Sequence, residues 1–249
     1  MSNNLQILWH QGKQFIPNLT TSQVPGIFRG RPVISSTEVD LNALAALCPT
    51  NAIGTKPVSV DMGKCTFCGE CAIQFPDKIS FTKDYKLSAT ARENLIIKES
   101  DENPLLINPD EIRKEIHRVF GKSLKLRQVS AGGDNSCEME LNASNNVQFD
   151  MSRFGIEFVA SPRHADGIVI TGPISKNMAR PLEVCYNAVP DPKVIILAGT
   201  DAISGGIFAD SPALDRSFLS NHHIDLYIPG NPVHPLTFIN GILDLTRRS

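Results

Sequence analysis

The chain has 249 residues, of which 41% are hydrophobic and 20% are charged, and its formal net charge is −2. This composition is typical of a globular protein, and the length is sufficient for two small domains. The mixed charges argue against the basic face of a nucleic-acid binder, and no apolar run approaches the roughly 20 residues that span a bilayer. Because residues 1–6 lack the features of a signal peptide, we expect a cytoplasmic protein whose clustered cysteines bind metal rather than form disulfides.

The first part of the chain divides into three segments. Residues 1–35 are predicted to be an extended arm, since they contain several residues that break regular structure: Pro17, Pro25, Gly26, Gly30 and Pro32. Residues 36–98 form a first domain that contains four of the six cysteines. The polar residues 99–107 are predicted to be a linker, and residues 108–249 form a second domain.

The second domain shows alternating helices and strands. A helix is predicted to start at Asn108, with Pro109 as its first residue, and to end at Gly121. The further predicted elements are strands at residues 124–129, 156–160, 167–171 and 194–198, and helices at residues 137–149, 175–188 and 235–246. Apolar, β-branched strands between helices indicate a doubly wound and mainly parallel sheet, in which ligands lie beyond the carboxyl ends of the strands.

The cysteines of the first domain have the spacing of an iron–sulfur protein. Cys65, Cys68 and Cys71 form a C-x2-C-x2-C run, and Cys48 is followed by a proline, as is the last cysteine of a ferredoxin run. In two-cluster ferredoxins each cluster takes three cysteines from one run and the fourth from the other. These four cysteines make one complete set, which predicts one [4Fe–4S] cluster.

The second set of ligand positions has lost every sulfur. These positions are Glu38, Leu41, Leu44 and Phe75. Such a coordinated loss indicates that one site is kept and the other is erased, with apolar side chains filling the vacated volume. A structural zinc site with four cysteines is the alternative, although zinc usually takes two separated C-x2-C pairs.

The first domain resembles a known family of electron-transfer subunits. The similarity is carried by residues 26–33, with the sequence GIFRGRPV, by residues 48–50 and 64–71 around the cysteines, and by residues 84–87. These segments look like the two-cluster ferredoxin subunit of formate hydrogenlyase and its counterpart in complex I. The resemblance implies an α+β ferredoxin-like domain at residues 36–98.

The second domain resembles the small subunit of energy-converting, group 4 [NiFe] hydrogenases, a family shared with the 20 kDa subunit of complex I. The motifs occur in order and at similar spacing, at residues 154–156, 161–166, 171–173, 190–193, 204–208 and 227–230. The resemblance implies an α/β flavodoxin-like domain with a mainly parallel sheet, packed against a hydrogenase-like large subunit. The chain as a whole looks like a fusion of the two subunits.

The resemblance also implies a second cluster site, which this sequence does not preserve. Members of the family bind a proximal [4Fe–4S] cluster with four cysteines, and the matching positions here are Asp134, Cys137, Asp201 and Asn231. Ala131 replaces a further cysteine of the hydrogenase-type members. One thiolate with two carboxylates and an amide is a poor ligand set for soft iron and sulfide, so we expect this site to hold no cluster.

These observations lead to two functional hypotheses within one family. The chain is expected to be a non-catalytic iron–sulfur subunit that relays electrons in a membrane-attached complex related to group 4 hydrogenases and complex I. Alternatively, it is a structural subunit of an ion-translocating complex that has abandoned hydrogenase chemistry. In both cases its partners are a large subunit and membrane subunits, and it lies peripherally at the inner membrane without a span of its own. A zinc-binding interaction protein is the more distant alternative, and no catalytic residue is expected.

Overall fold

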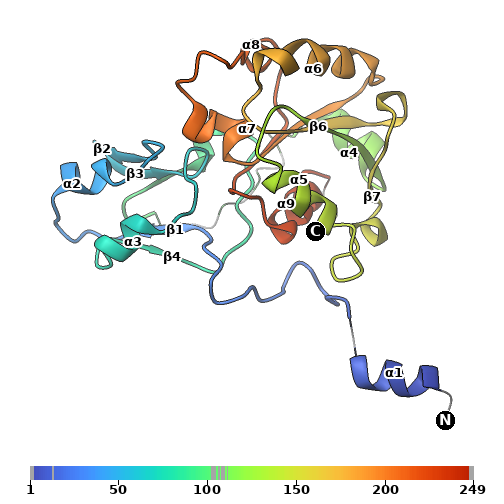
Figure 1. The fold of residues 1–249 in the computed structure, drawn as a ribbon, viewed down its shortest axis with the longest axis horizontal. Helices are drawn as coiled ribbons and strands as arrows, with labels where there is room; N and C mark the ends of the chain where they lie inside the picture. The colour runs from blue at the N-terminus through green and yellow to red at the C-terminus, as the bar shows by residue number, and fades with distance from the viewer. Residues whose placement is uncertain are drawn as a thin grey trace.

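The computed structural model describes residues 3–12, 14–101, 105, 107, 110 and 112–246. The N-terminal region contains short elements (Figure 1). They are α1 (Asn3–Gln11), β1 (Pro32–Ile34), α2 (Leu41–Ala46), β2 (Ile53–Thr55), β3 (Val58–Asp61), α3 (Glu70–Gln74), β4 (Ile79–Phe81), η1 (Arg92–Leu95) and β5 (Ile96–Lys98). Strands β2, β3 and β5 form an antiparallel sheet, and β1 pairs with β4 in a second one.

A parallel sheet forms the C-terminal region, as the sequence predicts, and it has five strands rather than the four predicted ones. Its strands are β6 (Leu124–Ser130), β7 (Ile156–Phe158), β8 (Gly167–Thr171), β9 (Val194–Ala198) and β10 (Leu226–Ile228). The connecting helices are α4 (Lys114–Phe120), α5 (Ser136–Ala143), η3 (Met151–Phe154), η4 (Pro162–His164), α6 (Lys176–Ala188), α7 (Thr200–Ser204), η5 (Gly206–Phe208), α8 (Ser217–Asn221) and α9 (Pro235–Leu245). The order β7-β6-β8-β9-β10 is 2-1-3-4-5 along the chain, which is the order of flavodoxin-like sheets.

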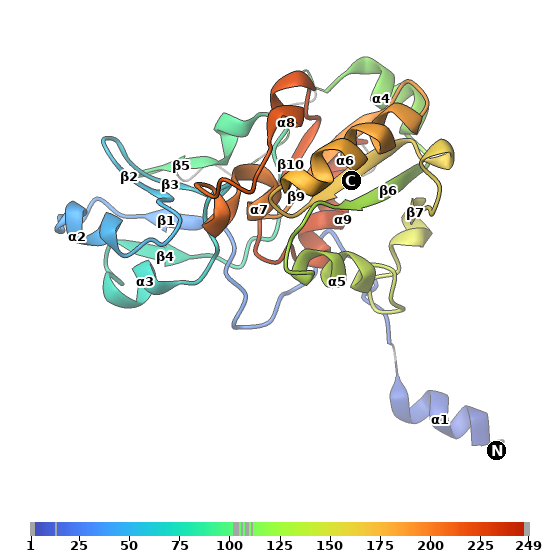
Figure 2. The ribbon, with the colours of Figure 1, turned by 45° about the horizontal axis from the view of Figure 1, so that its top comes forward.

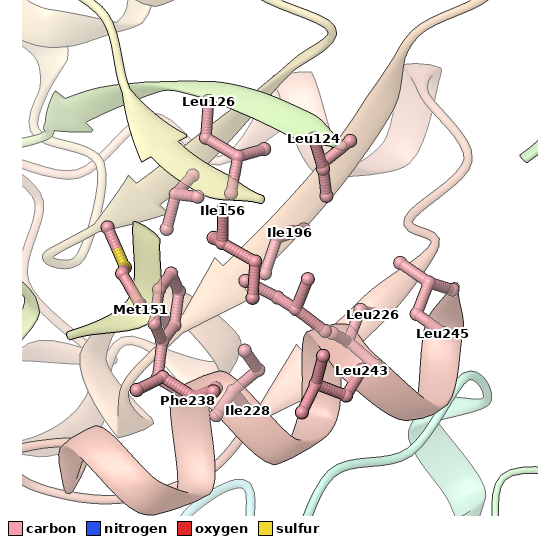
Figure 3. Close-up of a cluster of buried hydrophobic side chains, with 14 of the residues drawn as sticks. Leu124, Leu126, Met151, Ile156, Ile196, Leu226, Ile228, Phe238, Leu243 and Leu245 are labelled. Carbon is pink, nitrogen blue, oxygen red and sulfur yellow. The ribbon is translucent and has the colours of Figure 1, made fainter. Parts of the chain in front are cut away.

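Helices cover both faces of this sheet (Figure 2). Every residue of the central strands β8 and β9 is buried, which explains their continuous apolar sequences. One face packs against α4, α5 and α9, and the other packs against α6, α7 and α8. On the first face the Phe238 side chain of α9 lies among Ile156, Ile196 and Ile228 of the strands (Figure 3).

The N-terminal region is joined to the parallel sheet by backbone and core contacts. Ala89 forms an antiparallel bridge with Tyr227 of the edge strand β10, with N–H···O distances of 3.0 and 2.8 Å. Met62, Leu87 and Ile97 belong to the same buried cluster as Ile168 and Ile195 of the sheet. The two regions therefore share a hydrophobic core, while the boundaries at residues 35, 98 and 107 remain predictions.

Several predicted elements need correction. The arm at residues 1–35 is not extended throughout, because Asn3–Gln11 is helical; its prolines begin only at Pro17. The helix predicted at residues 137–149 ends at Ala143, where the Ser144 hydroxyl bonds back to the Glu140 carbonyl and two asparagines follow. The predicted cap at Asn108 and Pro109 lies outside the described residues. In the described part of the chain, no helix is long and apolar enough to cross a membrane.

An ion pair between the half-exposed Arg113 and the buried Asp225 fixes the start of α4 to the edge of the sheet. Arg113 Nε and Nη2 donate to the two carboxylate oxygens of Asp225 at 2.7 and 3.0 Å, and the Ile195 N–H donates to the same carboxylate at 2.9 Å. The Asp225 side chain is only 2% exposed, and burial raises its pKa despite the neighbouring Arg113. The charged form of Asp225 therefore depends on its hydrogen-bond donors.

Arg113→Met should lower the free energy of unfolding by about 3 kcal/mol at neutral pH, because it leaves a buried carboxylate without its counter-charge. The loss of unfolding free energy relative to wild type should become smaller as the pH falls, since the raised pKa of Asp225 lets the buried carboxylate accept a proton. Urea unfolding at two pH values measures both effects, with the exposed Lys114→Met as the control. Equal stabilities of the two variants would contradict this role.

Candidate metal-binding site

The three-cysteine run forms a tight loop before α3. Cys65 N–H donates to the Asp61 carbonyl at 2.9 Å, and Phe67 and Gly69 then adopt left-handed φ angles of 54° and 81°. The φ of +81° at Gly69 favours glycine, and a Cβ atom there would also lie 2.4 Å from Nε of Arg29, whose exposed side chain would have to move. The loop therefore reverses the chain and places Cys71 in the first turn of α3.

Cys48 reaches the same place from the end of α2. Its N–H donates to the Ala45 carbonyl at 3.1 Å, and Asn51, with a φ of 51°, turns the chain into β2. The side chains of Cys48, Cys65, Cys68 and Cys71 line one small cavity, together with the apolar residues Ile53, Val60 and Phe81. The structure thus brings the four sequence-predicted ligands together.

Burial and mutual repulsion disfavour thiolates in this cavity. The pKa of Cys65 is raised to about 12, mainly by burial and in smaller part by the neighbouring Cys71, Cys48 and Cys68, while the Phe67 N–H opposes the shift. Burial likewise raises the pKa of Cys71 to about 11. Ala52 N–H and Phe67 N–H donate to Sγ of Cys48 and Cys65 at 3.2 and 3.3 Å. A positively charged metal centre is what would stabilise four thiolates here.

The donor set suits an iron–sulfur cluster by its chemistry, since four cysteine side chains line the cavity. Among the described residues, no group of three or more histidine, cysteine, aspartate or glutamate side chains is arranged to hold a single metal ion. In a cubane each thiolate binds a different iron, so the four sulfurs surround the cluster without meeting at one atom. Soft thiolates and backbone N–H donors to sulfur are the environment that iron–sulfur clusters use.

Three of the four positions at which the sequence predicts lost cluster ligands belong to a small apolar core. Leu44 is fully buried, and Leu41 and Phe75 pack against the same cluster as Ile34, Ile53 and Ile79. Glu38 lies exposed at the surface. Apolar packing therefore occupies three of the four positions.

The structure gathers three of the four residues at the positions of the proximal cluster. Burial raises the pKa of Cys137 to about 12, the Val233 N–H opposes this shift, and the carboxylates of Asp201 and Asp134 add to it. Asp134 instead caps the following turn, since its Oδ1 accepts from the Ser136 N–H and hydroxyl at 2.9 and 2.6 Å. Asn231 stands two residues before Val233 and lines a neighbouring cavity of about 290 Å³ with Phe67 and Glu140.

Hydrogen bonds from Arg216 hold the segment that contains Asp201, which lies in α7. Arg216 donates to the backbone carbonyls of Asp201, Ala202 and Ile203 at 3.1, 2.8 and 2.9 Å, and to that of Pro173 at 2.9 Å. The Asp201 side chain is 9% exposed, and its Oδ1 has no hydrogen-bond partner among the described residues. Burial raises the pKa of Asp201. A guanidinium thus holds the backbone of α7, the helix that contains Asp201.

Two buried polar side chains beside the site, Glu138 and Thr200, are not predicted by the sequence. Glu138 is buried and bridges the carboxyl ends of β6 and β8, accepting from the Ser130 and Thr171 hydroxyls at 2.6 and 2.7 Å. Thr200 is fully buried, and its hydroxyl donates to the Cys65 carbonyl at 2.7 Å. The position of Thr200 directly after a buried strand is a weak indication that it lies near a ligand site. Its partner, Cys65, lies 135 residues away, so the sequence does not predict the contact.

The fold and site define a doubly wound α/β protein with a four-cysteine cavity beside its sheet. Residues 135–245 match the model of the NADH ubiquinone oxidoreductase 20 kDa subunit family. A probable membrane-bound hydrogenase subunit of Pyrococcus furiosus is 30% identical over 129 residues, which cover 52% of this chain and 77% of that protein. The chain belongs to this family of complex I and group 4 hydrogenase subunits.

Two further relatives and one solved structure are also similar to this chain. Formate hydrogenlyase subunit 7 of Escherichia coli is 38% identical over 130 residues, covering 52% of this chain and 51% of that protein. A subunit of the NADH-quinone oxidoreductase of Clostridium beijerinckii is 40% identical over 117 residues, covering 45% of this chain and 67% of that protein. A chain of the archaeal membrane-bound sulfane sulfur reductase is 28% identical with a TM-score of 0.45, covering 51% of this chain and 70% of that one.

In the metal-free protein at pH 8, iodoacetamide should label the exposed Cys68 well before Cys65. A thiol with a pKa of about 12 is ionised in roughly one molecule in 10⁴ at that pH. Raising the pH should bring Cys71 into reaction before Cys65, since its pKa is lower. Mass spectrometry of the labelled peptides measures the order, with the urea-unfolded chain as the reference. Equal rates for Cys65 and Cys68 in the folded chain would contradict the described burial.

Arg216→Met should lower the free energy of unfolding by about 2–4 kcal/mol, because four backbone carbonyls lose their donor. Arg180→Met, at an exposed position of α6, is the matched control and should change it by less than about 0.5 kcal/mol. Chemical denaturation of the two variants makes the comparison. If Arg216→Met had the same free energy of unfolding as Arg180→Met, the stability of the segment around Asp201 would not depend on Arg216.

Proposed function

We propose that this protein is the iron–sulfur subunit of a membrane-attached complex related to group 4 hydrogenases and complex I, with one [4Fe–4S] cluster on Cys48, Cys65, Cys68 and Cys71. The observation that carries the proposal is the convergence of these four thiols on one cavity. Family membership supplies the setting, since relatives are named as subunits of membrane-bound hydrogenase, formate hydrogenlyase and NADH-quinone oxidoreductase. The N-terminal region would then be a ferredoxin-like module fused to the small subunit.

The proposed partners follow from the same setting. The C-terminal sheet would pack against a hydrogenase-like large subunit, and membrane subunits would hold the assembly at the inner membrane, with this chain on its cytoplasmic side. The cluster would supply one-electron redox chemistry, while the protein would hold its thiolates and shield them with Ile53, Val60 and Phe81. No residue of the chain is proposed to be catalytic.

The altered proximal site favours a structural platform as the second candidate. The carboxylate of Asp134 is engaged with Ser136, and Arg216 holds the loop that contains Asp201, so this site keeps its shape through protein contacts. With one thiol left there, the usual electron path to a large subunit would be interrupted. In that case the cluster at Cys48 and residues 65–71 would stabilise the fold of an assembly subunit.

Metal and sulfide analysis of the anaerobically purified full chain tests the cluster. We expect about four irons and four sulfides per chain, falling to less than about one iron in Cys48→Ser, since a cubane with a missing thiolate is poorly held. Cys185→Ser, in α6, is the matched control and should retain the full content. One zinc and no sulfide would contradict the cluster and favour the zinc-binding alternative.

Dithionite reduction followed by electron paramagnetic resonance separates the relay from the platform. A relay predicts a reduced-cluster signal that integrates to about one spin per chain. A cluster with full iron content that resists reduction would reject the relay and support the platform.

A further inference from the structure

The cysteine loop lies against the edge of the parallel sheet where α/β proteins bind their ligands. Strand β9 ends at Ala198, and the next two residues, Gly199 and Thr200, begin the turn into α7. Thr200 Oγ1 donates to the backbone carbonyl of Cys65 at 2.7 Å. The carboxyl end of β9 is thus in direct contact with one of the proposed cluster ligands.

Thr200 is itself held rigidly. Its N–H donates to the Gly230 carbonyl at 2.9 Å, its hydroxyl lies 3.2 Å from the same oxygen, and Gly199 N–H donates to Ile228 at 2.9 Å. The side chain has no exposed surface. Thr200 therefore connects Cys65 to the ends of two neighbouring strands, β9 and β10.

The hydroxyl of Thr200 acts on charge at the site through its orientation. Because it donates to the Cys65 carbonyl, the positive end of its O–H dipole points at the peptide of a proposed ligand. A positive end directed at this peptide favours the more negative, reduced state of a group bound by Cys65. The same bond holds the Cys65 backbone against movement of the loop.

We propose that Thr200 is a positioning residue for the cluster: its hydroxyl fixes Cys65 and raises the reduction potential of the group bound there. The inference rests on the proposed iron–sulfur function. In this inference the C-terminal sheet positions a ligand of the N-terminal cluster, and this role does not require a cluster at the proximal site. Because Asp201 follows directly, the contact also joins the cysteine loop to the place where the proximal site has changed.

The test compares Thr200→Val, which keeps the shape and loses the hydroxyl, with Thr200→Ser, which keeps the hydroxyl. Thr246→Val is the matched control, since Thr246 is a fully buried threonine whose hydroxyl donates to the Ile242 carbonyl at 2.7 Å in α9. Each full-length variant is reduced in an electron paramagnetic resonance titration with dithionite as the electron donor. At the wild-type midpoint, Thr200→Val should show an about threefold lower ratio of reduced to oxidised cluster, and the other two should match wild type.

Iron retention gives a second readout if Thr200→Val is unstable. Loss of iron from Thr200→Val, with full content in Thr200→Ser and Thr246→Val, supports the positioning role. Unchanged potential in an iron-loaded Thr200→Val, or equal iron loss in Thr200→Val and Thr246→Val, overturns it. Those results leave the proposed function intact, whereas wild-type protein without iron and sulfide removes the proposed function and this inference together.

Discussion

The convergence of four cysteines on one small cavity is the constraint on which the proposed site depends. Cys65 is buried and Cys68 is exposed, and burial raises the pKa of Cys65 and of Cys71, so a thiolate at either of these two positions is disfavoured without a bound cation. A metal centre reverses this balance and turns a costly arrangement into a stable one. The left-handed residues Phe67 and Gly69 fix the loop that makes the convergence possible.

The region around the cavity and the region beyond β9 are held together in different ways. Leu41, Leu44 and Phe75 stand where the sequence predicts that a sister site has lost its cysteines, and they pack into the small core beside the cavity. Beyond β9, Arg216 instead donates to the backbone carbonyls of Asp201 and Ala202 in α7. Apolar packing supports the first region, and hydrogen bonds from one guanidinium support the second.

Much of this arrangement could be predicted from the sequence, for physical reasons. The apolar strands at 167–171 and 194–198 identify a buried parallel sheet, and the spacing of Cys65, Cys68 and Cys71 fixes a loop that serves one centre. The short strand β10 and helices α7 and α8 were missed, because three to five residues carry too little periodic pattern. The bridge between Ala89 and Tyr227 and the contact of Thr200 with Cys65 depend on chain segments far apart, which no local signal reveals.

The most direct test of the central claim is anomalous diffraction from anaerobic crystals of the full chain, collected at the iron and zinc absorption edges. We expect one compact group of iron sites enclosed by Cys48, Cys65, Cys68 and Cys71, and no iron beside Cys137. A single zinc peak among the four cysteines, or a cluster of iron at Cys137, would contradict it.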